Sequence, residues 1–336
     1  MNQASRAFPV MPLSAAVASA ISPPTAVAQD QELALEEVIV TARKRTESVQ
    51  DIPASIQAMS GADIREMGAR GMADYTRFLN EVNVLNYGTG SSKVIFRGAD
   101  NGSGFLAQAT SSVYVDEISV TTLGDQPSVR MVDVERVEAL AGPQGTIYGS
   151  DAQTGTLRII TNKPVINEFE AVLDASIRDS DEGEESWDGS IVLNLPVLED
   201  RLALRLVAFG ASDGGYVDNV PGHTPDTSVV NGPGFWPAGF GTLDNSDAVE
   251  KDWNESDISG WRAALRWDIT ENWSASLGAL HQKTESGADS FYDPYVGDLE
   301  VVQFFDSYRD DEYDLYSLTI EGDLGFAQLV SATAYY

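Results

Sequence analysis

The chain contains no cysteine and only two histidines among its 336 residues. Without cysteine there is no disulfide, no thiolate zinc site and no cysteine nucleophile. His223 and His281 lie far apart in the sequence, so a metal site built on imidazole groups is not expected. No arrangement of a nucleophile with a base is visible either. The sequence therefore predicts a protein that is not an enzyme, with no catalytic residue, no metal and no cofactor.

Basic residues are scarce: 21 lysines and arginines stand against 52 aspartates and glutamates, giving a formal net charge of −31. Binding to nucleic acid requires a basic footprint on the protein, so nucleic acid is excluded as a partner. The negative charge fits an outward-facing or periplasmic protein, and equally a protein from a salt-adapted proteome. The total charge by itself therefore locates no binding site.

Long hydrophobic runs are also absent, since no segment has the roughly 18 consecutive apolar residues that a membrane-spanning helix needs. The longest apolar tract covers residues 8–28 and ends in Ala26-Val27-Ala28, which resembles the cleavage site of a secretory signal. We predict that residues 1–28 are a removed signal peptide. A disordered or wrongly started N-terminus is the alternative.

From residue 168 onward, apolar and polar side chains alternate. In one such segment Trp261, Leu265 and Trp267 alternate with Arg262 and Arg266. Segments of about ten residues with this period are typical of transmembrane β-barrel strands with a polar interior, whereas a soluble antiparallel sheet with one wet face is the alternative. Connections of alternating short and long length favour the barrel, and we expect Trp261, Trp267 and Trp273 to form one interfacial girdle near a short turn. The predicted strands are 168–178, 187–195, 201–210, 260–269, 272–282, 313–322 and 326–336.

Residues 47–164 lack this alternation and combine a stretch of helical spacing with short β-rich runs, which predicts a compact mixed α/β unit. Residues 61–79 place Ile64, Met67, Met72, Tyr75 and Phe78 at helical spacings. Short β-rich runs follow, each bounded by Gly, Pro or Asn. They cover residues 93–97, 112–115, 134–139 and 156–161.

Motifs in and just before this unit resemble those of TonB-dependent outer-membrane receptors. The segment Glu37-Val38-Ile39-Val40-Thr41-Ala42 resembles the TonB box, and such an extended segment suits strand addition to the sheet edge of a partner. Residues 94–98 resemble the Ile-Arg-Gly segment of the family, 112–118 its Val-Tyr-Val-Asp-Gly-Val strand, 134–149 its longest signature and 156–164 the strand that closes its plug. The motif residues are Arg97, Gly98, Asp116, Glu135, Arg136, Glu138, Gly142, Pro143, Gly145, Tyr148 and Gly149.

The chain also departs from the family pattern at three places. Glu117 stands where glycine is usual, Ala141 replaces a common arginine or lysine, and residues 150–155 differ from the usual loop. These departures affect local detail rather than the fold, and the stretch 142–145 is expected to form a tight turn.

The resemblance implies a flexible arm with the TonB box at residues 29–46, a plug domain at 47–164 and an incomplete antiparallel transmembrane β-barrel at 165–336. About seven strands are present, against 22 in a plugged transporter. The implied location is the outer membrane of a Gram-negative bacterium. The implied partners are TonB with its inner-membrane energising complex, outer-membrane lipid and a ligand.

The implied function is energised uptake of a scarce ligand. A ferric siderophore is the default, and haem, cobalamin and oligosaccharides are the alternatives. A different alternative is a truncated, non-transporting receptor fragment whose plug at most binds ligand.

Two further expectations concern side chains. Arg97, Glu135, Arg136 and Glu138 are expected to form ion pairs between plug and barrel, because unpaired charges removed from water are costly; exposed charges on a soluble domain are the alternative. Phe235, Trp236 and Phe240 in the long connection are candidate ligand contacts, since aromatic rings stack on ligands. They could equally form a small core of that connection.

Overall fold

The computed structural model describes residues 39–42, 44, 47–86, 92–102, 108–121, 126–181, 183–224, 242–287, 290–305 and 307–336. The predicted signal peptide, residues 29–38 of the arm with Glu37 and Val38, and the aromatic residues Phe235, Trp236 and Phe240 lie outside this part. No helix within the described ranges is long and apolar enough to cross a membrane.

The first unit is built on a five-stranded sheet with the order β3-β8-β9-β6-β7. Its strands are β3 (Ser55–Ser60), β8 (Val134–Ala141), β9 (Gly155–Thr161), β6 (Ser111–Val115) and β7 (Ile118–Ser119). Strand β9 pairs in parallel with β6 and antiparallel with β8. A separate hairpin joins β4 (Val82–Asn86) to β5 (Ser92–Phe96). The four β-rich runs predicted from the sequence are therefore confirmed as β5, β6, β8 and β9.

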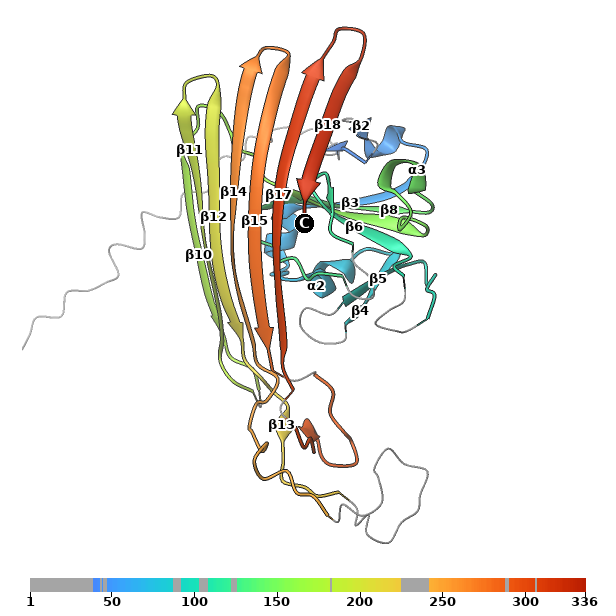
Figure 1. Cartoon of the computed structure of the whole chain (residues 1–336), viewed down its shortest axis with the longest axis vertical. Helices are drawn as coiled ribbons and strands as arrows, with labels where there is room; N and C mark the ends of the chain where they lie inside the picture. Colours follow the sequence, from blue (N-terminus) through green and yellow to red (C-terminus); the bar gives the residue numbers. More distant parts are fainter. Residues whose placement is uncertain are drawn as a thin grey trace, which may run out of the picture. The chain divides into compact units, whose positions relative to one another are not determined.

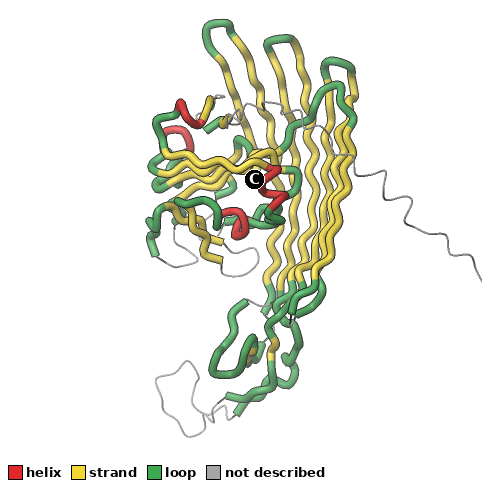
Figure 2. The backbone as a smooth tube through the Cα atoms, turned by 180° about the vertical axis from the view of Figure 1, so that it is seen from behind, coloured by secondary structure: helices red, strands yellow, loops and turns green. Residues whose placement is uncertain are grey.

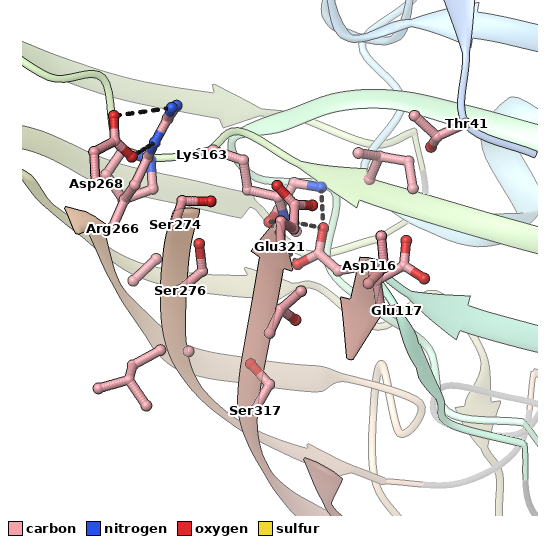
Figure 3. A pocket seen from close by; sticks show the side chains of 18 of the residues that line it. Thr41, Asp116, Glu117, Lys163, Arg266, Asp268, Ser274, Ser276, Ser317 and Glu321 are labelled. Carbon is pink, nitrogen blue, oxygen red and sulfur yellow. Dashed lines mark hydrogen bonds and ion pairs between the residues drawn. The ribbon is translucent and has the colours of Figure 1, made fainter. Parts of the chain in front are cut away.

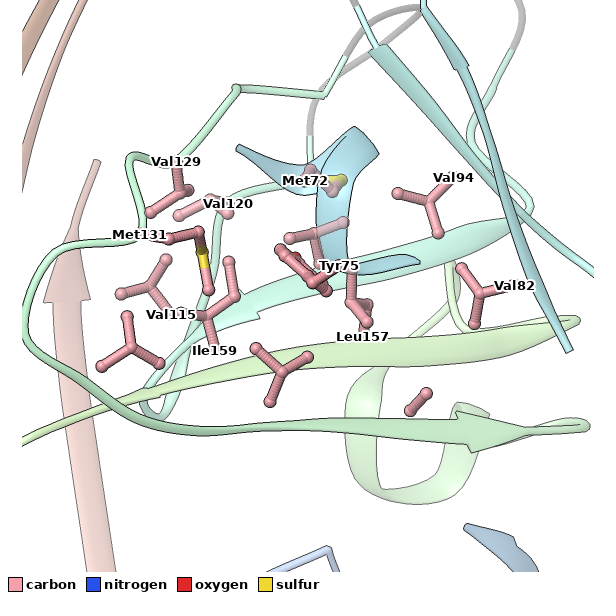
Figure 4. Close-up of a cluster of buried hydrophobic side chains, with 14 of the residues drawn as sticks. Met72, Tyr75, Val82, Val94, Val115, Val120, Val129, Met131, Leu157 and Ile159 are labelled. Atoms are coloured by element: carbon pink, nitrogen blue, oxygen red, sulfur yellow. The ribbon is translucent and has the colours of Figure 1, made fainter. Parts of the chain in front are cut away.

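The helices of this unit are short: α1 (Gly61–Glu66), α2 (Met72–Thr76), α3 (Gly145–Tyr148) and a 3-10 turn η2 (Val49–Asp51). The helical spacing across residues 61–79 does not correspond to one continuous helix. Gly68 adopts a positive φ of 65° and ends the first helix. Helix α1 begins at a capping box formed by Ser60 and Asp63. Figure 4 shows Met72 and Tyr75 of α2 packed among Val115, Leu157 and Ile159 of the sheet, which form the core of the unit.

The second unit is an antiparallel sheet of seven strands, called here the wall sheet, with the order β10-β11-β12-β14-β15-β17-β18 (Figure 1). Each predicted alternating segment is confirmed as one of these strands, and the described strands do not close into a barrel. Their bounds are β10 (Glu170–Arg178), β11 (Ser186–Leu198), β12 (Leu202–Asp213), β14 (Ser256–Thr270), β15 (Trp273–Ser286), β17 (Arg309–Asp323) and β18 (Gln328–Tyr335).

The two faces of the wall sheet differ, as the alternation predicts. Arg205 and Arg262 contact the first unit, whereas Trp261 and Trp267 on the opposite face are 42% and 48% exposed. The expected single tryptophan girdle is wrong, because Trp261 pairs with Ala208 and His281 well away from the turn at residues 271–272. Trp261 and Trp267 therefore mark two levels, roughly 20 Å apart at the rise of an extended strand.

Short turns lie at one end of the wall sheet and long connections at the other (Figure 2). Two of the long connections are tied together by parallel pairing of β13 (Asp218–Asn219) with β16 (Glu300–Val301). A small core of Val217, Trp253 and Val301 supports this pairing. In transmembrane β-barrels the short turns are periplasmic and the long connections extracellular. The end of the wall sheet with the long connections is called here its outer end.

Candidate functional site

The segment Ile39–Ala42 is docked on the first unit. Strand β1 (Ile39–Val40) pairs antiparallel with β2 (Glu47–Ser48). Val40 and Ala42 are fully buried in a small cluster that includes Leu140 and Tyr148. The sequence predicts a flexible arm over residues 29–46, but Val40 and Ala42 of this arm are packed between strand β8 and helix α3.

A buried carboxylate binds the backbone of this segment. The Thr41 N–H donates to Glu138 Oε1 at 2.9 Å, and Glu138 has no exposed surface. Arg158 holds the same carboxylate through Nη1 to Oε2 at 2.6 Å, and Arg136 Nε donates to Oε1 at 2.8 Å. Both guanidiniums also donate to Thr41 Oγ1 at 3.0 Å. Thr41 is therefore fixed through its backbone and its side chain at once.

This arrangement follows from the strand register. Glu138 on β8 stands directly opposite Arg158 on β9, and opposite charges in that position attract each other. Burial opposes the charge on Arg158, but Tyr148, Glu138 and Glu117 together raise the pKa of its guanidinium. The pair thus remains ionic inside the protein and presents charged donors and acceptors to Thr41.

Two more contacts hold the segment. The hydroxyl of Tyr148 donates to the Ala42 carbonyl at 2.6 Å, and burial raises the pKa of Tyr148, so this hydroxyl keeps its proton. Lys44 pairs with Glu117, whose other carboxylate oxygen accepts from Arg158 Nη2 at 2.8 Å. Glu117, the departure from the family's glycine, therefore links the docked segment to the buried pair.

Among the described residues, none of the four charged residues named from the sequence forms an ion pair with the seven wall strands, so the expected plug-to-barrel pairs are not found there. Arg97 pairs with Glu81, and Arg136 pairs with Glu135 and Glu138, all within the first unit. Neighbouring strands and turns supply an opposite charge closer than the wall sheet can. These four side chains therefore organise the plug itself.

Other residues join the first unit to the wall sheet. Asp133, whose side chain is only 4% exposed, accepts from Arg205 at 2.6 and 2.8 Å and from Arg262 at 2.6 Å. Asp133 lies one residue before the signature at 134–149, and its wall partners come from β12 and β14. An aspartate at the start of a charged strand is the only sequence signal for this contact, and it does not identify the two arginines.

A cavity of about 910 Å³ lies between the first unit and the wall sheet. Figure 3 shows Thr41, Asp116, Glu117 and Lys163 on one side and polar wall residues such as Ser276 on the other. The cavity also reaches the short turns at residues 200–201 and 271–272. The docked segment therefore lies at the periplasmic end of the polar space between the two units.

The remaining motif residues shape turns around this site. Gly98, Gly142 and Gly149 adopt positive φ angles of 71°, 96° and 81°, which glycine tolerates at no steric cost. Pro143 follows Gly142 in the predicted tight turn, and Gly145 begins α3. Asp116 accepts from the backbone N–H and the hydroxyl of Thr161, both at 2.9 Å. Within the part of the chain that the structure covers, no group of three or more His, Asp or Glu could hold a metal ion.

Known proteins share this architecture. Residues 48–156 match the family model described as the TonB-dependent receptor plug domain. An iron-regulated outer membrane virulence protein of Vibrio cholerae is 26% identical over 53% of this chain and 25% of its own length. A pesticin receptor of Yersinia pestis is 30% identical over 44% of this chain and 22% of its own length.

Among solved structures, the ferric yersiniabactin uptake receptor FyuA from Yersinia pestis superposes with a TM-score of 0.64 at 19% identity, covering 84% of this chain and 40% of its own. The chain spans about a quarter of the length of the curated relatives it matches. The motifs, the plug sheet and the polar-faced wall sheet agree with these matches. Residues 48–156 are therefore a plug domain of the TonB-dependent receptor family, and the wall sheet beside it has the fold of a part of the barrel in these outer-membrane receptors.

Proposed function

We propose that the receptor imports its ligand in an energised step, in which the segment Glu37–Ala42 binds TonB on the periplasmic side. The observation that carries this proposal is the docking of Thr41 on Glu138 at the end of the wall sheet that bears the short turns. A segment held there by a few hydrogen bonds can detach and add as a strand to a partner's sheet. Ile39 is already half-exposed in the docked state.

The opposite end of the receptor is the place for ligand binding in this proposal. The long connections of the wall sheet face outward by the usual polarity of such barrels. Outer-membrane lipid surrounds the apolar face of the wall, where Leu173 and Ile177 are more than three-quarters exposed. Ligand binding outside and TonB binding inside are then separated by the plug.

The ligand we propose is an iron–siderophore complex. The relatives in the comparison are named as an iron-regulated protein, a pesticin receptor and a ferric yersiniabactin uptake receptor. Haem, cobalamin and oligosaccharides remain the alternatives to be tested in parallel. TonB and its inner-membrane energising complex are the proposed protein partners.

Uptake of radioactive iron tests this proposal. The receptor is expressed in an iron-starved host that lacks its own siderophore receptors, with and without TonB. We expect at least one iron-55 siderophore complex to accumulate only when both proteins are present, and to bind the cell surface when TonB is missing. Iron accumulation that does not depend on TonB would overturn the proposal, and uptake of labelled haem or cobalamin instead would replace the ligand.

A further inference from the structure

Three arginines gather where the plug meets the outer ends of the wall strands. Arg70 lies just before α2 and Arg130 shortly before β8, whereas Arg178 is the last residue of β10. Two carboxylates face them, Asp188 on β11 and Asp213 at the end of β12. These strand ends lead into the long connections. The cluster is therefore at the opposite end of the wall sheet from the docked TonB box.

Two of the three arginines have close partners. Arg70 contacts Asp188 Oδ1 through Nε at 2.5 Å and donates from Nη2 to Ser176 Oγ at 2.6 Å. Arg178 Nη2 contacts Asp213 Oδ1 at 2.6 Å. Each carboxylate of the cluster is thus already occupied by one guanidinium.

Arg130 has no such partner. Its nearest carboxylate oxygens are 3.7 Å from Nη1 on Asp213 and 4.0 Å from Nη2 on Asp188, beyond hydrogen-bond distance. The side chain is only 8% exposed, and Nη2 is buried without a hydrogen-bond partner. Arg178 Nε is buried and unpartnered as well. Among the residues that the structure describes, three guanidiniums of the cluster thus lie against two carboxylates.

Burial lowers the pKa of the Arg130 guanidinium. The carboxylates of Asp213 and Asp188 raise this pKa, whereas the positive charges of Arg70 and Arg178 lower it further. An arginine nevertheless stays charged in proteins, and an unpaired buried charge is costly. A buried, charged arginine whose Nη2 has no hydrogen-bond partner, at the boundary of the plug, indicates a binding role rather than a packing role.

The guanidinium of Arg130 is not needed to anchor the plug. The backbone N–H of Arg130 donates to Gln282 Oε1 on β15 at 3.0 Å, and Gln282 Nε2 donates to the Ser128 carbonyl at 2.6 Å. These two hydrogen bonds fix the position of Arg130 through its backbone. Its side chain is therefore free to serve a ligand.

We propose that Arg130, with Arg70 and Arg178, accepts one carboxylate group of the imported ligand. A guanidinium matches a carboxylate in a bidentate geometry, and one carboxylate balances the one surplus charge. This inference rests on the proposed function, because it takes the ligand to arrive from the outer end of the wall sheet.

The charge of the outer connections favours a single carboxylate over a strongly anionic ligand. Residues 179–185, 214–255 and 287–308 contain 17 aspartates and glutamates but only one lysine. Such a surface repels small multivalent anions before they reach the plug. A carboxylate carried on a larger ligand of low net charge passes this surface and then meets the arginines.

Benzoate and the isosteric, uncharged benzamide are probes for this site. The melting temperature of the intact receptor in detergent is measured against each probe at matched ionic strength, since a ligand that binds the native state raises it saturably. We compare wild type with Arg130→Met and Arg178→Met, and use Arg77→Met, an exposed arginine of the plug, as the matched control.

We expect benzoate, but not benzamide, to stabilise the wild type and Arg77→Met. The half-saturating benzoate concentration should rise about tenfold or more in Arg130→Met, the size expected for a lost hydrogen bond between charged groups. Arg130→Met without benzoate should melt at or above the wild-type temperature, because the substitution removes a buried charge that makes no side-chain hydrogen bond. Arg178→Met, which removes the second guanidinium of the proposed site, should show the same loss of benzoate response.

The proposal is overturned if benzoate gives no saturable shift in the wild type, or shifts Arg130→Met equally, or if benzamide acts like benzoate. These outcomes are separate from the proposed function, which is judged by TonB-dependent iron uptake in the same strains. Iron uptake without a benzoate site removes the carboxylate acceptor alone, and a benzoate site without uptake removes the import function alone.

Discussion

The plug sheet pairs strands that lie far apart in the sequence, whereas the wall sheet pairs strands that follow one another, and the two sheets treat charge in opposite ways. Every residue of β9 in the plug is buried, including Arg158, whereas along β17 in the wall exposed residues alternate with partly or fully buried ones over most of its length. In the plug a charge must find its partner on a neighbouring strand, because both faces of the sheet are covered. In the wall, polar and apolar side chains alternate between the two faces, so a charge can stay partly exposed even where it has a partner, as Arg178 does with Asp213.

This difference in the burial of charge distinguishes the part of the molecule that binds the docked segment. The wall sheet supplies a polar inner surface and an apolar outer surface, and among its described residues each ion pair between wall strands keeps at least one partner partly exposed. The plug encloses Glu138 and Arg158 completely, and the docked segment binds to that pair. The buried ion pair therefore lies next to the docked segment, which is the element that we propose to move.

The largest expected effect comes from breaking the docked segment itself. Proline at position 39 removes a backbone donor needed for strand addition, so Ile39→Pro should abolish iron uptake while leaving ligand binding at the cell surface intact. Ile39→Ala keeps the backbone N–H and is the matched control, with uptake retained. Normal uptake by Ile39→Pro would rule out this segment as the TonB box.

A smaller but still large effect is expected from unbalancing the buried pair. Glu138→Gln leaves Arg158 without its enclosed partner, which typically costs about 3–5 kcal/mol. The measurement is amide hydrogen exchange of β9 in the purified receptor, where protection should fall accordingly. Glu135→Gln alters an exposed partner of Arg136 and should cost less than about 1 kcal/mol. Equal losses in both variants would mean that burial does not distinguish these carboxylates.

The wall sheet offers the matching test on the lipid side. Leu265 lies on the face opposite Arg262 and Arg266, so Leu265→Arg should cost about 2–4 kcal/mol near the bilayer midplane. Urea unfolding of the receptor in phospholipid vesicles measures this cost. Ala264→Arg places an arginine at the neighbouring position, on the inner face of the sheet. We expect it to lower the free energy of unfolding much less. The reverse order would show that the register of β14 is shifted by one residue.

The smallest effect concerns pH. Burial acts to raise the pKa of Asp116, but Lys163, the Thr161 N–H and Arg262 outweigh it and lower the pKa below its ordinary value. The stabilisation from ionised Asp116 is thus complete above about pH 4 and is lost as the pH falls through the lowered pKa. Asp116→Asn should flatten the drop in melting temperature below pH 4, and Asp51→Asn at an exposed position should not. An unchanged acid profile in Asp116→Asn would remove this linkage.

The same contrast explains what the sequence could predict. The seven wall strands are readable because Trp261, Leu265 and Trp267 alternate with Arg262 and Arg266 over a long segment. The short plug strands are readable because each is a compact β-rich run. The break at Gly68 is not readable from spacing, because the apolar positions continue across it and only the backbone conformation ends the helix.

The contacts of the candidate site are harder to predict, because they join residues far apart in the chain. Thr41 and Glu138 are separated by 97 positions and Lys44 and Glu117 by 73. Arg158 was not singled out from the sequence, although a charge within a β-rich run needs a partner if that strand is buried. The motif named Glu138 and Arg136, but only the strand register shows that their partners lie within the plug.

The most direct test of the account is to lock the docked segment in place. The chain has no cysteine, and Ile39 and Ser48 are direct partners across the antiparallel pair of β1 and β2, so Ile39→Cys with Ser48→Cys can form a disulfide. We predict that the oxidised double variant binds iron–siderophore but does not import it, and that a reductant restores import to the level of the Ile39→Cys single variant. Equal import by the oxidised and reduced double variant would contradict the claim that this segment must leave the plug for transport.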